Sequence, residues 1–492
     1  MPDRLSSIRA TLDSYGQGHL LAFWDELDEA HQAALLTQLH GIDFDQLQVL
    51  IETLVVRTQQ AERPQDVEPA PYYAQEPGST YDAGHYREVG EELLRAGKVA
   101  AFTVAGGQGT RLGWKGPKGA YPATVVTGSP LFRVFAEQIL ANQDRYGKTI
   151  RWYILTSPAN DTPTRAFIQD NRCFGLDRRN IFMFPQATIP SIEAETGKLL
   201  LTDKGRVAVN PDGHGGSIKA LVASGAIDAM LARGVEHISY FQVDNPLVKV
   251  IDPLFIGLHA AAPDSSGEMS SKMVRKTSPD EKVGIFCRAD GKTIVIEYSD
   301  PPDELAQQRD DNGRLRFCAG SIAVHMLGAK FVKKLAAGDD GFALPYHRAE
   351  KIVPYVDTKS AELIQPQEAN AVKMETLVFD ALPLAESSIV YETSRAEEFA
   401  PIKNAQGNDS PATSHQLQSD RAGRWLEAHG VTVPRDADGH VSARIEISPL
   451  TALQASDLTR LDLPDTIEPG QTIALYTRFH LSERLDGATH SE

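Results

Sequence analysis

The chain has 492 residues, of which 41% are hydrophobic and 23% are charged, and its formal net charge at pH 7 is −17. This composition is typical of a globular protein, and the length predicts two or three domains. The negative charge argues against nucleic acid and anionic membranes as partners, since both require extended basic surface. A phosphate site must therefore be a local cluster of cations.

Cysteine usage and hydropathy indicate the compartment. Cys173, Cys287 and Cys318 form no CxxC pair, which favours free thiols in a reducing compartment over a zinc site or a disulfide framework. No stretch approaches 18 uninterrupted apolar residues, and the sequence starts without an apolar leader. We therefore expect a cytoplasmic protein without a membrane segment. The sequence predicts no particular oligomeric state.

The first 60 residues are predicted to be helical, because apolar residues such as Leu35, Leu36 and Leu39 recur at helical spacing. Residues 61–80 contain four prolines and indicate an extended linker. From residue 86 onward, helices and strands alternate. The predicted segments are a helix over 86–96, a strand over 99–104, a helix over 131–139, a strand over 151–156, a helix over 161–170, a strand over 181–184, a helix over 217–233 and a strand over 237–243.

This alternation predicts an α/β fold with a mainly parallel sheet, helices on both faces and ligands at the carboxyl ends of the strands. Residues 272–274 and 292–298 are predicted to form an antiparallel pair around a turn at 289–291, and residues 316–325 a further strand. After residue 381 we expect a small α+β module. It has a polar loop over 407–414, a helix over 419–429 and short strands over 441–447 and 471–476.

The chain is thus predicted to have three consecutive parts. They are an N-terminal helical region with its linker over 1–95, a central α/β domain over 96–380 and the C-terminal module over 381–492.

The most informative stretch is the glycine-rich loop that follows the predicted strand 99–104. It holds five glycines between positions 105 and 117, together with Arg111, Lys115 and Lys118. Residues without a Cβ let the backbone approach a ligand closely, and N–H groups at the end of a strand can bind phosphate. The glycine spacing fits neither a Walker A loop nor a dinucleotide fingerprint. Three cations suit a triphosphate better than a nicotinamide cofactor, so a phosphate-binding loop is favoured over a glycine-rich turn with solvated cations.

Three further positions carry groups that suit nucleotide chemistry. Asp244 follows the strand 237–243, where a carboxylate can hold Mg²⁺ through one bond while substrate phosphates supply the others; the alternative is an Asp that caps the next turn. The segment 210–216 opens the helix 217–233, and its backbone amides can approach a base or a phosphate. Gln186 offers a donor and an acceptor to the edge of a pyrimidine.

Several segments resemble one family. The loop from Val104 to Gly119 and the phrases VDNPLVKVIDPLFIG and VRKTSPDEKVGIFCRADGKTIVIEYSD are similar to those of the eukaryotic-type UDP-sugar pyrophosphorylases (UDPGP type 1), above all their UDP-N-acetylglucosamine branch. The resemblance runs from about residue 20 to residue 430. It implies a GT-A/Rossmann-like core, a nucleotidyltransferase domain over 96–380, and formation of a UDP-sugar and pyrophosphate from UTP and a hexose or N-acetylhexosamine 1-phosphate, with Mg²⁺.

The resemblance also implies a role for each candidate residue. Arg111, Lys118 and Lys373 would be the catalytic cations, and Asp244 would hold the metal. The implied nucleotide contacts are Ala105, Gly106, Gly107, Lys118, Gln186 and Gly213, and the implied sugar contacts are His214, Asn245, Gly284, Glu297, Tyr298 and Ser321. Lys403 is a further, weaker candidate for a phosphate contact.

Two sugar positions depart from the family pattern. His214 stands where the N-acetylglucosamine branch commonly has Asn, and Ser321 stands where the family usually has Asn. N-acetylglucosamine 1-phosphate is the predicted substrate, and glucose, galactose or a broad range of sugars is the alternative. Two rival functions from other classes are a nucleotide-sugar binding protein without turnover and a nicotinamide oxidoreductase.

Overall fold

The computed structural model describes residues 2–57, 66–76, 78, 80–297, 303–336 and 344–476. These residues form two compact units, each made of separate stretches of the chain. The first unit comprises Met1–Gln65, Gln186–Lys219 and Asp340–Asp380, and the second comprises Asp66–Pro185, Ala220–Asp339 and Ala381–Glu492. The three consecutive parts predicted from the sequence divide the chain differently, and that division stays a prediction.

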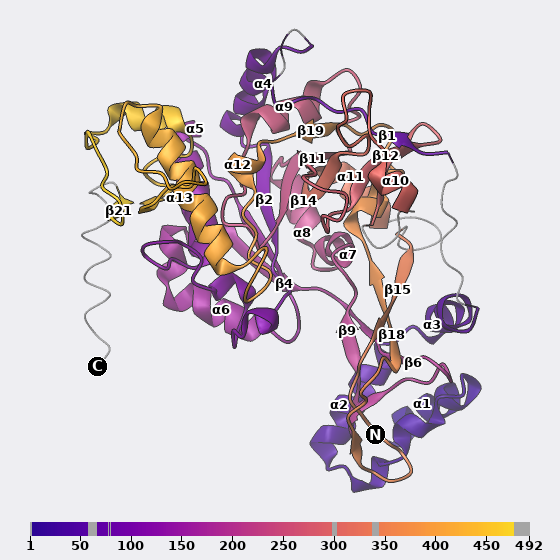
Figure 1. Ribbon diagram of the computed structural model, residues 1–492. Helices are drawn as coiled ribbons and strands as arrows, with labels where there is room; N and C mark the ends of the chain where they lie inside the picture. Colours follow the sequence, from indigo (N-terminus) through magenta and orange to yellow (C-terminus); the bar gives the residue numbers. More distant parts are fainter. Residues whose placement is uncertain are drawn as a thin grey trace, which may run out of the picture. The chain divides into compact units, whose positions relative to one another are not determined.

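One large sheet forms the centre of the second unit (Figure 1). Its strands β10, β2, β3 and β4 are neighbours in that order and parallel, as the βα alternation predicts. β14 pairs antiparallel with β10 and also with β11 and β12, which extends the sheet on that side. The strands are β1 (Glu68–Pro69), β2 (Val99–Val104), β3 (Trp152–Thr156), β4 (Ile181–Pro185), β10 (His237–Gln242), β11 (Met269–Arg275), β12 (Ile285–Ala289), β13 (Lys292–Ile296), β14 (Ala319–Gly328) and β19 (Val390–Glu392).

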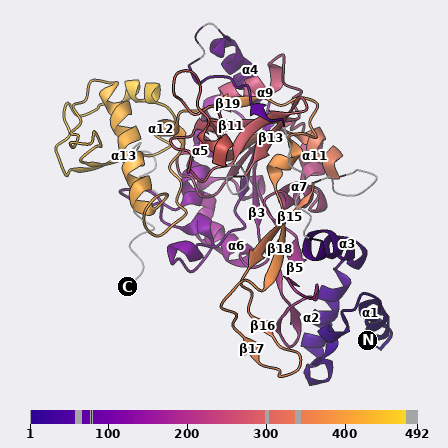
Figure 2. The ribbon, with the colours of Figure 1, turned by 45° about the vertical axis from the view of Figure 1, so that its right-hand side comes forward.

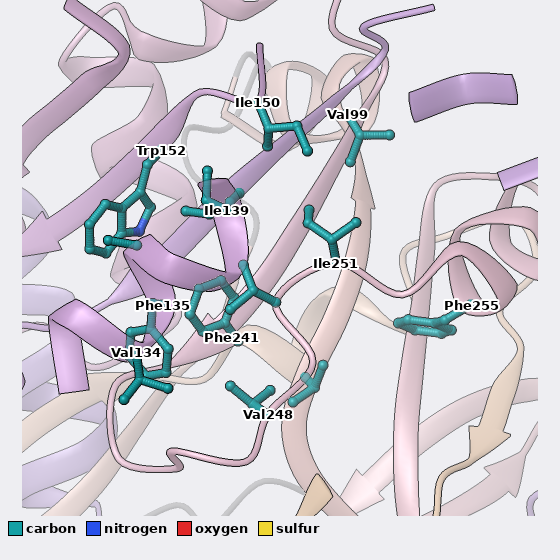
Figure 3. Packing of buried hydrophobic residues seen from close by; sticks show 14 of the residues in the cluster. Val99, Val134, Phe135, Ile139, Ile150, Trp152, Phe241, Val248, Ile251 and Phe255 are labelled. Carbon is teal, nitrogen blue, oxygen red and sulfur yellow. The ribbon is translucent and has the colours of Figure 1, made fainter. Parts of the chain in front are cut away.

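The main apolar core of the second unit lies between the sheet and its helices. Figure 3 shows Phe135 of α5 packed beside Phe241 of β10, with ring centroids 5.2 Å apart. α4 and α9 approach each other closely because Gly90 and Gly257 lie at their contact; a Cβ on Gly90 would lie 1.8 Å from the carbonyl oxygen of Pro253. The helices are α4 (Ala83–Arg95), α5 (Leu131–Tyr146), α6 (Asp161–Asp170), α8 (Ala226–Ala232), α9 (Pro253–Ala261), α10 (Asp303–Gln307), α11 (Ala329–Ala336), α12 (Arg395–Glu398) and α13 (Pro411–Glu427).

A buried ion cluster ties several of these elements together. The Lys272 ammonium on β11 is fully buried and lies 2.6 Å from Asp252 and 2.7 Å from Glu398. Lys249 adds a second cation, 3.2 Å from the other oxygen of Glu398. Burial acts to raise the pKa of Asp252, but Lys272 and Lys249 outweigh it and hold that pKa well below its usual range. The cluster therefore holds ionised groups inside the protein by pairing all of them.

The C-terminal module packs around its own apolar core within the second unit. It contains α13 and a parallel strand pair, β20 (Arg444–Ile447) and β21 (Thr472–Leu475). The carboxylate of Glu446 accepts the backbone N–H groups of Val126 and Thr127 at 2.7 and 2.8 Å. These hydrogen bonds join the module to the segment that follows the glycine-rich loop.

The first unit combines the N-terminal helices with small antiparallel sheets (Figure 2). Its main sheet has the order β15–β18–β6, and its core joins α1–α3 to β5, β6, β8 and β18. The strands are β5 (Thr188–Pro190), β6 (Ile192–Glu193), β7 (Leu201–Asp203), β8 (Arg206–Val207), β9 (Val209–Pro211), β15 (Tyr346–Lys351), β16 (Tyr355–Val356), β17 (Leu363–Ile364) and β18 (Ala371–Thr376). The helices are α1 (Pro2–Ser14), α2 (Glu29–His40), α3 (Phe44–Leu50), continued by a π-helical turn over Ile51–Val56, and α7 (Gly216–Ala223), which crosses the boundary between the units.

Several predicted elements have other bounds than those observed, among them the helix predicted over 131–139, which is α5 and runs on to Tyr146, and three differences have a clear physical reason. The helix predicted over 217–233 is two helices, α7 and α8, because Gly225 adopts a left-handed conformation (φ +72°) between them. The hairpin at 289–291 is present, but β13 pairs there with β12 and not with residues 272–274, which lie in β11 and pair with β14 and β19. The helix predicted over 419–429 begins earlier, at Pro411, because Ser410 caps it.

Within the linker predicted over 61–80, β1 pairs with β12 and Tyr73 forms a bridge with Tyr391, whereas Gly78 lies in a turn. No helix among the described residues is long and apolar enough to cross a membrane.

We predict that Lys272→Met lowers the free energy of unfolding by about 3–5 kcal/mol, because it leaves two buried carboxylates with only Lys249 as a partner. Urea unfolding followed by circular dichroism measures the change. The matched control is Lys333→Met, since Lys333 pairs with Asp228 on the surface and its loss should cost at most about 1 kcal/mol. Equal effects of the two substitutions would contradict a special role for the buried cluster.

Candidate functional site

The glycine-rich loop leaves β2 at the edge where parallel strands present their carboxyl ends. Ala105 is fully buried, and its N–H donates to the carbonyl oxygen of Leu155 on β3 at 2.9 Å. The loop then folds back on itself, with the Lys118 N–H donating to the Gly107 carbonyl at 3.2 Å. A Cβ on Gly109 would lie 2.6 Å from Trp114, so this turn requires glycine. Gly107 is exposed and Gly106 partly so, as a phosphate-binding loop requires.

A buried amide that the sequence analysis missed fixes this loop. Asn160 follows β3, is 1% exposed, and donates from Nδ2 to the carbonyl oxygens of Ala105 and Gly107 at 3.0 and 3.2 Å. Its Oδ1 accepts the Ser157 N–H at 2.7 Å. Its place just after a parallel strand is the signal that could have identified it. Asn160 thus satisfies two carbonyl groups of the loop and fixes its backbone.

A lysine and an aspartate lie close together beside the glycine-rich loop. The Lys118 Nζ lies 3.9 Å from a carboxylate oxygen of Asp244, and the two side chains are 12% and 14% exposed. Burial lowers the pKa of Lys118, and the nearby cations Arg111 and Lys403 lower it further against the opposing effect of Asp244. The second unit thus brings together four of the predicted residues, together with Asp409, whose carboxylate lies 3.5 Å from the Lys403 ammonium. Three cations against two carboxylates leave a small excess of positive charge, which suits an anionic ligand.

β10 lies directly beside β2, and this pairing brings Asp244 to the same edge of the sheet as the glycine-rich loop. The two strands are parallel, with Gln242 opposite Val104. Asn245, the next residue, is 7% exposed, and Nδ2 donates to the Glu398 carbonyl at 2.6 Å. Its Oδ1 accepts backbone N–H groups from Leu247 and Ala400, both at 3.1 Å. Asn245 therefore links the end of β10 to the buried ion cluster, and its predicted sugar contact stays a prediction.

Three predicted sugar contacts lie together at a second place in this unit. The Ser321 N–H donates to the Gly284 carbonyl at 2.8 Å, and a Cβ on Gly284 would lie 3.3 Å from a carboxylate oxygen of Glu297. Gly284 is thus needed for the approach of Glu297 and of β13 behind it. Tyr298, predicted as a fourth sugar contact, lies outside the described residues.

The remaining predicted residues belong to the first unit, where Gln186 and the loop 212–216 form one group. Gln186 is 6% exposed, and its Nε2 donates to Asp212 at 3.2 Å and to the Gly213 carbonyl at 3.4 Å. The loop is packed on the end of β18, where Gly215 donates its N–H to the Thr376 carbonyl at 2.8 Å. Gly213 has φ +87°, and a Cβ there would lie 2.3 Å from that carbonyl oxygen. The close contact explains the glycine.

The imidazole of His214 is neutral and accepts a hydrogen bond from the backbone just after β18. Its Nδ1 accepts the Val378 N–H at 3.0 Å, so the ring proton is on Nε2. Burial lowers its pKa to about 4, although Glu375 and Asp380 act in the opposite direction.

Lys373 lies on β18, two residues before Glu375 and on the same face of the strand. Its Nζ is 2.5 Å from the Glu375 carboxylate, and the side chains are 18% and 28% exposed. Glu375 is a residue that the sequence analysis did not predict. Lys373 is also one of the cations that act on Asp212, which places it in the same group as Gln186 and Gly213.

Among the described residues no group of three or more His, Cys, Asp or Glu side chains could hold a metal ion. Asp244 therefore belongs to no group of described ligating side chains that could hold a metal ion by themselves. Such a carboxylate suits Mg²⁺ only in the mode in which substrate phosphates complete the coordination.

A parallel sheet with a glycine-rich loop, cations and one carboxylate at the carboxyl edge places this chain among the α/β proteins that bind nucleotides. Residues 56–426 match the family model described as UTP--glucose-1-phosphate uridylyltransferase. The chain belongs to this family.

Relatives of known name align over most of the chain. It is 36% identical to UDP-N-acetylhexosamine pyrophosphorylase-like protein 1 of Xenopus tropicalis, over 91% of this chain and 92% of that protein. It is 32% identical to UDP-N-acetylglucosamine diphosphorylase 2 of Arabidopsis thaliana, over 91% of this chain and 89% of that protein.

A solved structure has the same fold. The uridine diphosphate N-acetylglucosamine pyrophosphorylase of Trypanosoma brucei, in complex with an inhibitor, superposes with a TM-score of 0.77 at 25% identity. The match covers 96% of this chain and 98% of that chain. The predicted family and the predicted α/β fold class are therefore confirmed.

We predict that His214 stays neutral at pH 5.5 in the folded protein, because its pKa is lowered to about 4. His440 is the control, since its hydrogen bond to Asp420 raises its pKa and it should be protonated at that pH. Ring-nitrogen chemical shifts, assigned with His214→Asn and His440→Asn variants, distinguish the two states.

The lowered pKa of His214 also makes the stability of the folded protein depend on pH. An unfolded His titrates near pH 6.5, so the folded state loses stability as the pH falls from about 6.5 towards 4. The His214→Asn variant should lose less stability over this range than the wild type. A His214 that is protonated at pH 5.5 would contradict both predictions.

Proposed function

We propose that this chain is a UTP:sugar-1-phosphate uridylyltransferase that forms a UDP-sugar and pyrophosphate, with N-acetylglucosamine 1-phosphate as its preferred acceptor. One observation carries the proposal: the cluster of Lys118, Arg111 and Asp244 at the glycine-rich loop, in a chain of this family. The names of the aligned relatives support the N-acetylglucosamine branch. The protein is accordingly a nucleotidyltransferase.

The chemistry fits the residues present. A phosphate oxygen of the sugar 1-phosphate attacks the α-phosphorus of UTP, the bond from that phosphorus to the bridging oxygen breaks, and pyrophosphate leaves with the electron pair. The nucleophile is already anionic, so no general base is required. What the reaction needs is positioning and neutralisation of charge on the phosphates, and we assign the second task to Lys118 and Arg111.

We further propose that Asp244 holds Mg²⁺ together with the substrate phosphates, the mode in which a single carboxylate suffices. When bound, the ion would neutralise phosphate charge. Asp244 also acts on Lys118, whose ammonium lies 3.9 Å from its carboxylate. Burial lowers the pKa of Lys118, whereas the attraction of Asp244 raises it and so favours the charged form of the lysine.

Roles are also proposed for three residues of the first unit, taken by itself. Gln186 and Gly213 would contact the uracil base, and Lys373 would contact the phosphate of the sugar 1-phosphate. The short ion pair with Glu375 supports this role, because it holds the Lys373 ammonium in place while leaving it partly exposed.

The sugar would be read by Gly284, Glu297 and Ser321, whose contacts with one another support a common role. Ser321 is shorter than the Asn usual in the family, and this observation favours a second candidate, an enzyme for glucose or galactose 1-phosphate or for a broad range. We also propose a cytoplasmic location. The free thiols of the three cysteines support it.

The proposed function is tested by coupled detection of pyrophosphate, with UTP and a panel of N-acetylglucosamine, N-acetylgalactosamine, glucose and galactose 1-phosphates. The expected result is the highest kcat/KM with N-acetylglucosamine 1-phosphate. A higher value with glucose or galactose 1-phosphate would establish the second candidate instead. Absence of pyrophosphate with every sugar phosphate would overturn the assignment as an enzyme of this class.

We predict that Lys118→Ala lowers kcat by about 10²-fold or more, as the loss of one preorganised charge donor typically does. The control is Lys148→Ala, because Lys148 is exposed in the turn after α5 and should leave kcat within about twofold. Both variants are compared at saturating UTP and sugar phosphate. If Lys118→Ala turns over at a near-normal rate, the catalytic role of this lysine is wrong.

A further inference from the structure

The neighbours of Gln186 determine which way its side-chain amide faces. Its Nε2 faces two oxygen atoms, Oδ1 of Asp212 at 3.2 Å and the carbonyl oxygen of Gly213 at 3.4 Å. A carboxylate and a carbonyl are acceptors only. Turning the amide over would set its own oxygen against both of them, at a buried site where Gln186 and Asp212 are only 6% and 4% exposed. The amide nitrogen is therefore fixed towards Asp212.

This orientation determines what Gln186 can offer to a ligand. Among the hydrogen bonds between described residues, none reaches its Oε1, so the free end of the amide is an acceptor. The edge of uracil carries an N–H donor at N3, whereas cytosine has a lone pair at that position. An acceptor facing N3 attracts the first base and repels the second, which is how a site discriminates against a wrong ligand.

We propose that Asp212 is a positioning residue for base selection: it directs the Gln186 amide so that Oε1 accepts from N3 of uracil and rejects cytosine. The inference rests on the proposed function, in which Gln186 contacts the base of UTP. In this role Asp212 contacts neither the phosphates nor the sugar and acts on the base through Gln186.

The neighbours of Asp212 hold this residue in one position. Its backbone carbonyl accepts both the N–H and the hydroxyl of Thr376, at 2.8 and 2.9 Å. A Cβ on Gly216 would lie 2.1 Å from its Oδ1, so the loop leaves the carboxylate little room to move. Burial raises the pKa of Asp212 to about 6, while Lys219 and Lys373 favour the ionised form. At pH 8 the carboxylate is charged and can only accept.

The test is the ratio of kcat/KM for UTP to that for CTP, measured at pH 8 with one sugar 1-phosphate. A ratio is independent of the fraction of enzyme that is correctly folded. Asp212→Asn supplies an amide that can also donate, so the Gln186 amide is no longer forced into one direction. We expect the ratio to fall about tenfold, as the loss of a hydrogen bond to a charged group does. KM for the sugar 1-phosphate should remain within about twofold.

A double-mutant cycle separates positioning from general damage. Gln186→Met removes the amide and should lower the ratio by itself, and Asp212→Asn should then cause no further fall. If Asp212→Asn fails to fold, Asp212→Ala replaces it, because the hydrogen bonds of Thr376 go to the backbone carbonyl of residue 212.

Two results would overturn the proposal. One is an unchanged ratio in Asp212→Asn, and the other is an equal fall in the wild-type and Gln186→Met backgrounds. If the wild type releases no pyrophosphate, the proposed function fails, and the same ratio is measured as dissociation constants of UTP and CTP by titration calorimetry. Base selection is then judged without turnover, and equal affinity of the wild type for UTP and CTP would contradict the role of Asp212.

Discussion

The buried ion cluster of Lys272, Asp252, Glu398 and Lys249 is the constraint on which the functional half of the second unit depends. Each carboxylate in it also binds a neighbouring element: Asp252 caps α9 by accepting the Leu254 N–H at 3.2 Å, and Glu398 accepts the Thr393 hydroxyl. The backbone of Glu398 in turn holds Asn245, which adjoins Asp244. Charges inside a protein are stable only when paired, so the elements that supply them must stay in register. The position of Asp244 at the end of β10 is thereby fixed from the interior.

Close approach at glycines is a second physical feature, and it appears in each unit by itself. Around the glycine-rich loop of the second unit, Gly109 lies against Trp114, and Asn160 holds two loop carbonyls. In the first unit, Gly213 and Gly215 lie against the end of β18. A Cβ would prevent each of these contacts, which are with the Trp114 side chain at Gly109 and with backbone at Gly213 and Gly215. Each loop is thus held by close packing and by hydrogen bonds to its carbonyl groups, which is a suitable scaffold for binding a ligand.

Elements defined by local pattern could be predicted well from the sequence. β2 and α6 begin and end where predicted, because β2 is a continuous buried apolar run in a parallel sheet and α6 has one clear apolar face. Pairing over longer distances could not be predicted in the same way: residues 272–274 lie in β11, whose partners β14 and β19 are far along the chain. The residues that the sequence analysis missed, Asn160 and Asp212, act through contacts with backbone or side chains far along the chain. The only local signal for Asn160 is its place just after a parallel strand, and Asp212 lies within the segment 210–216 without a role of its own predicted for it, whereas Lys118 and Asp244 stand in motifs.

The central claim is that this chain interconverts UTP and a UDP-sugar. Its most direct test is the reverse reaction, followed by ³¹P NMR in a mixture of the protein, Mg²⁺, pyrophosphate and UDP-N-acetylglucosamine. We expect the resonances of UTP and of N-acetylglucosamine 1-phosphate to appear together and to grow in equal amounts as pyrophosphate is consumed. Unchanged spectra, or the appearance of UMP without UTP, would contradict it.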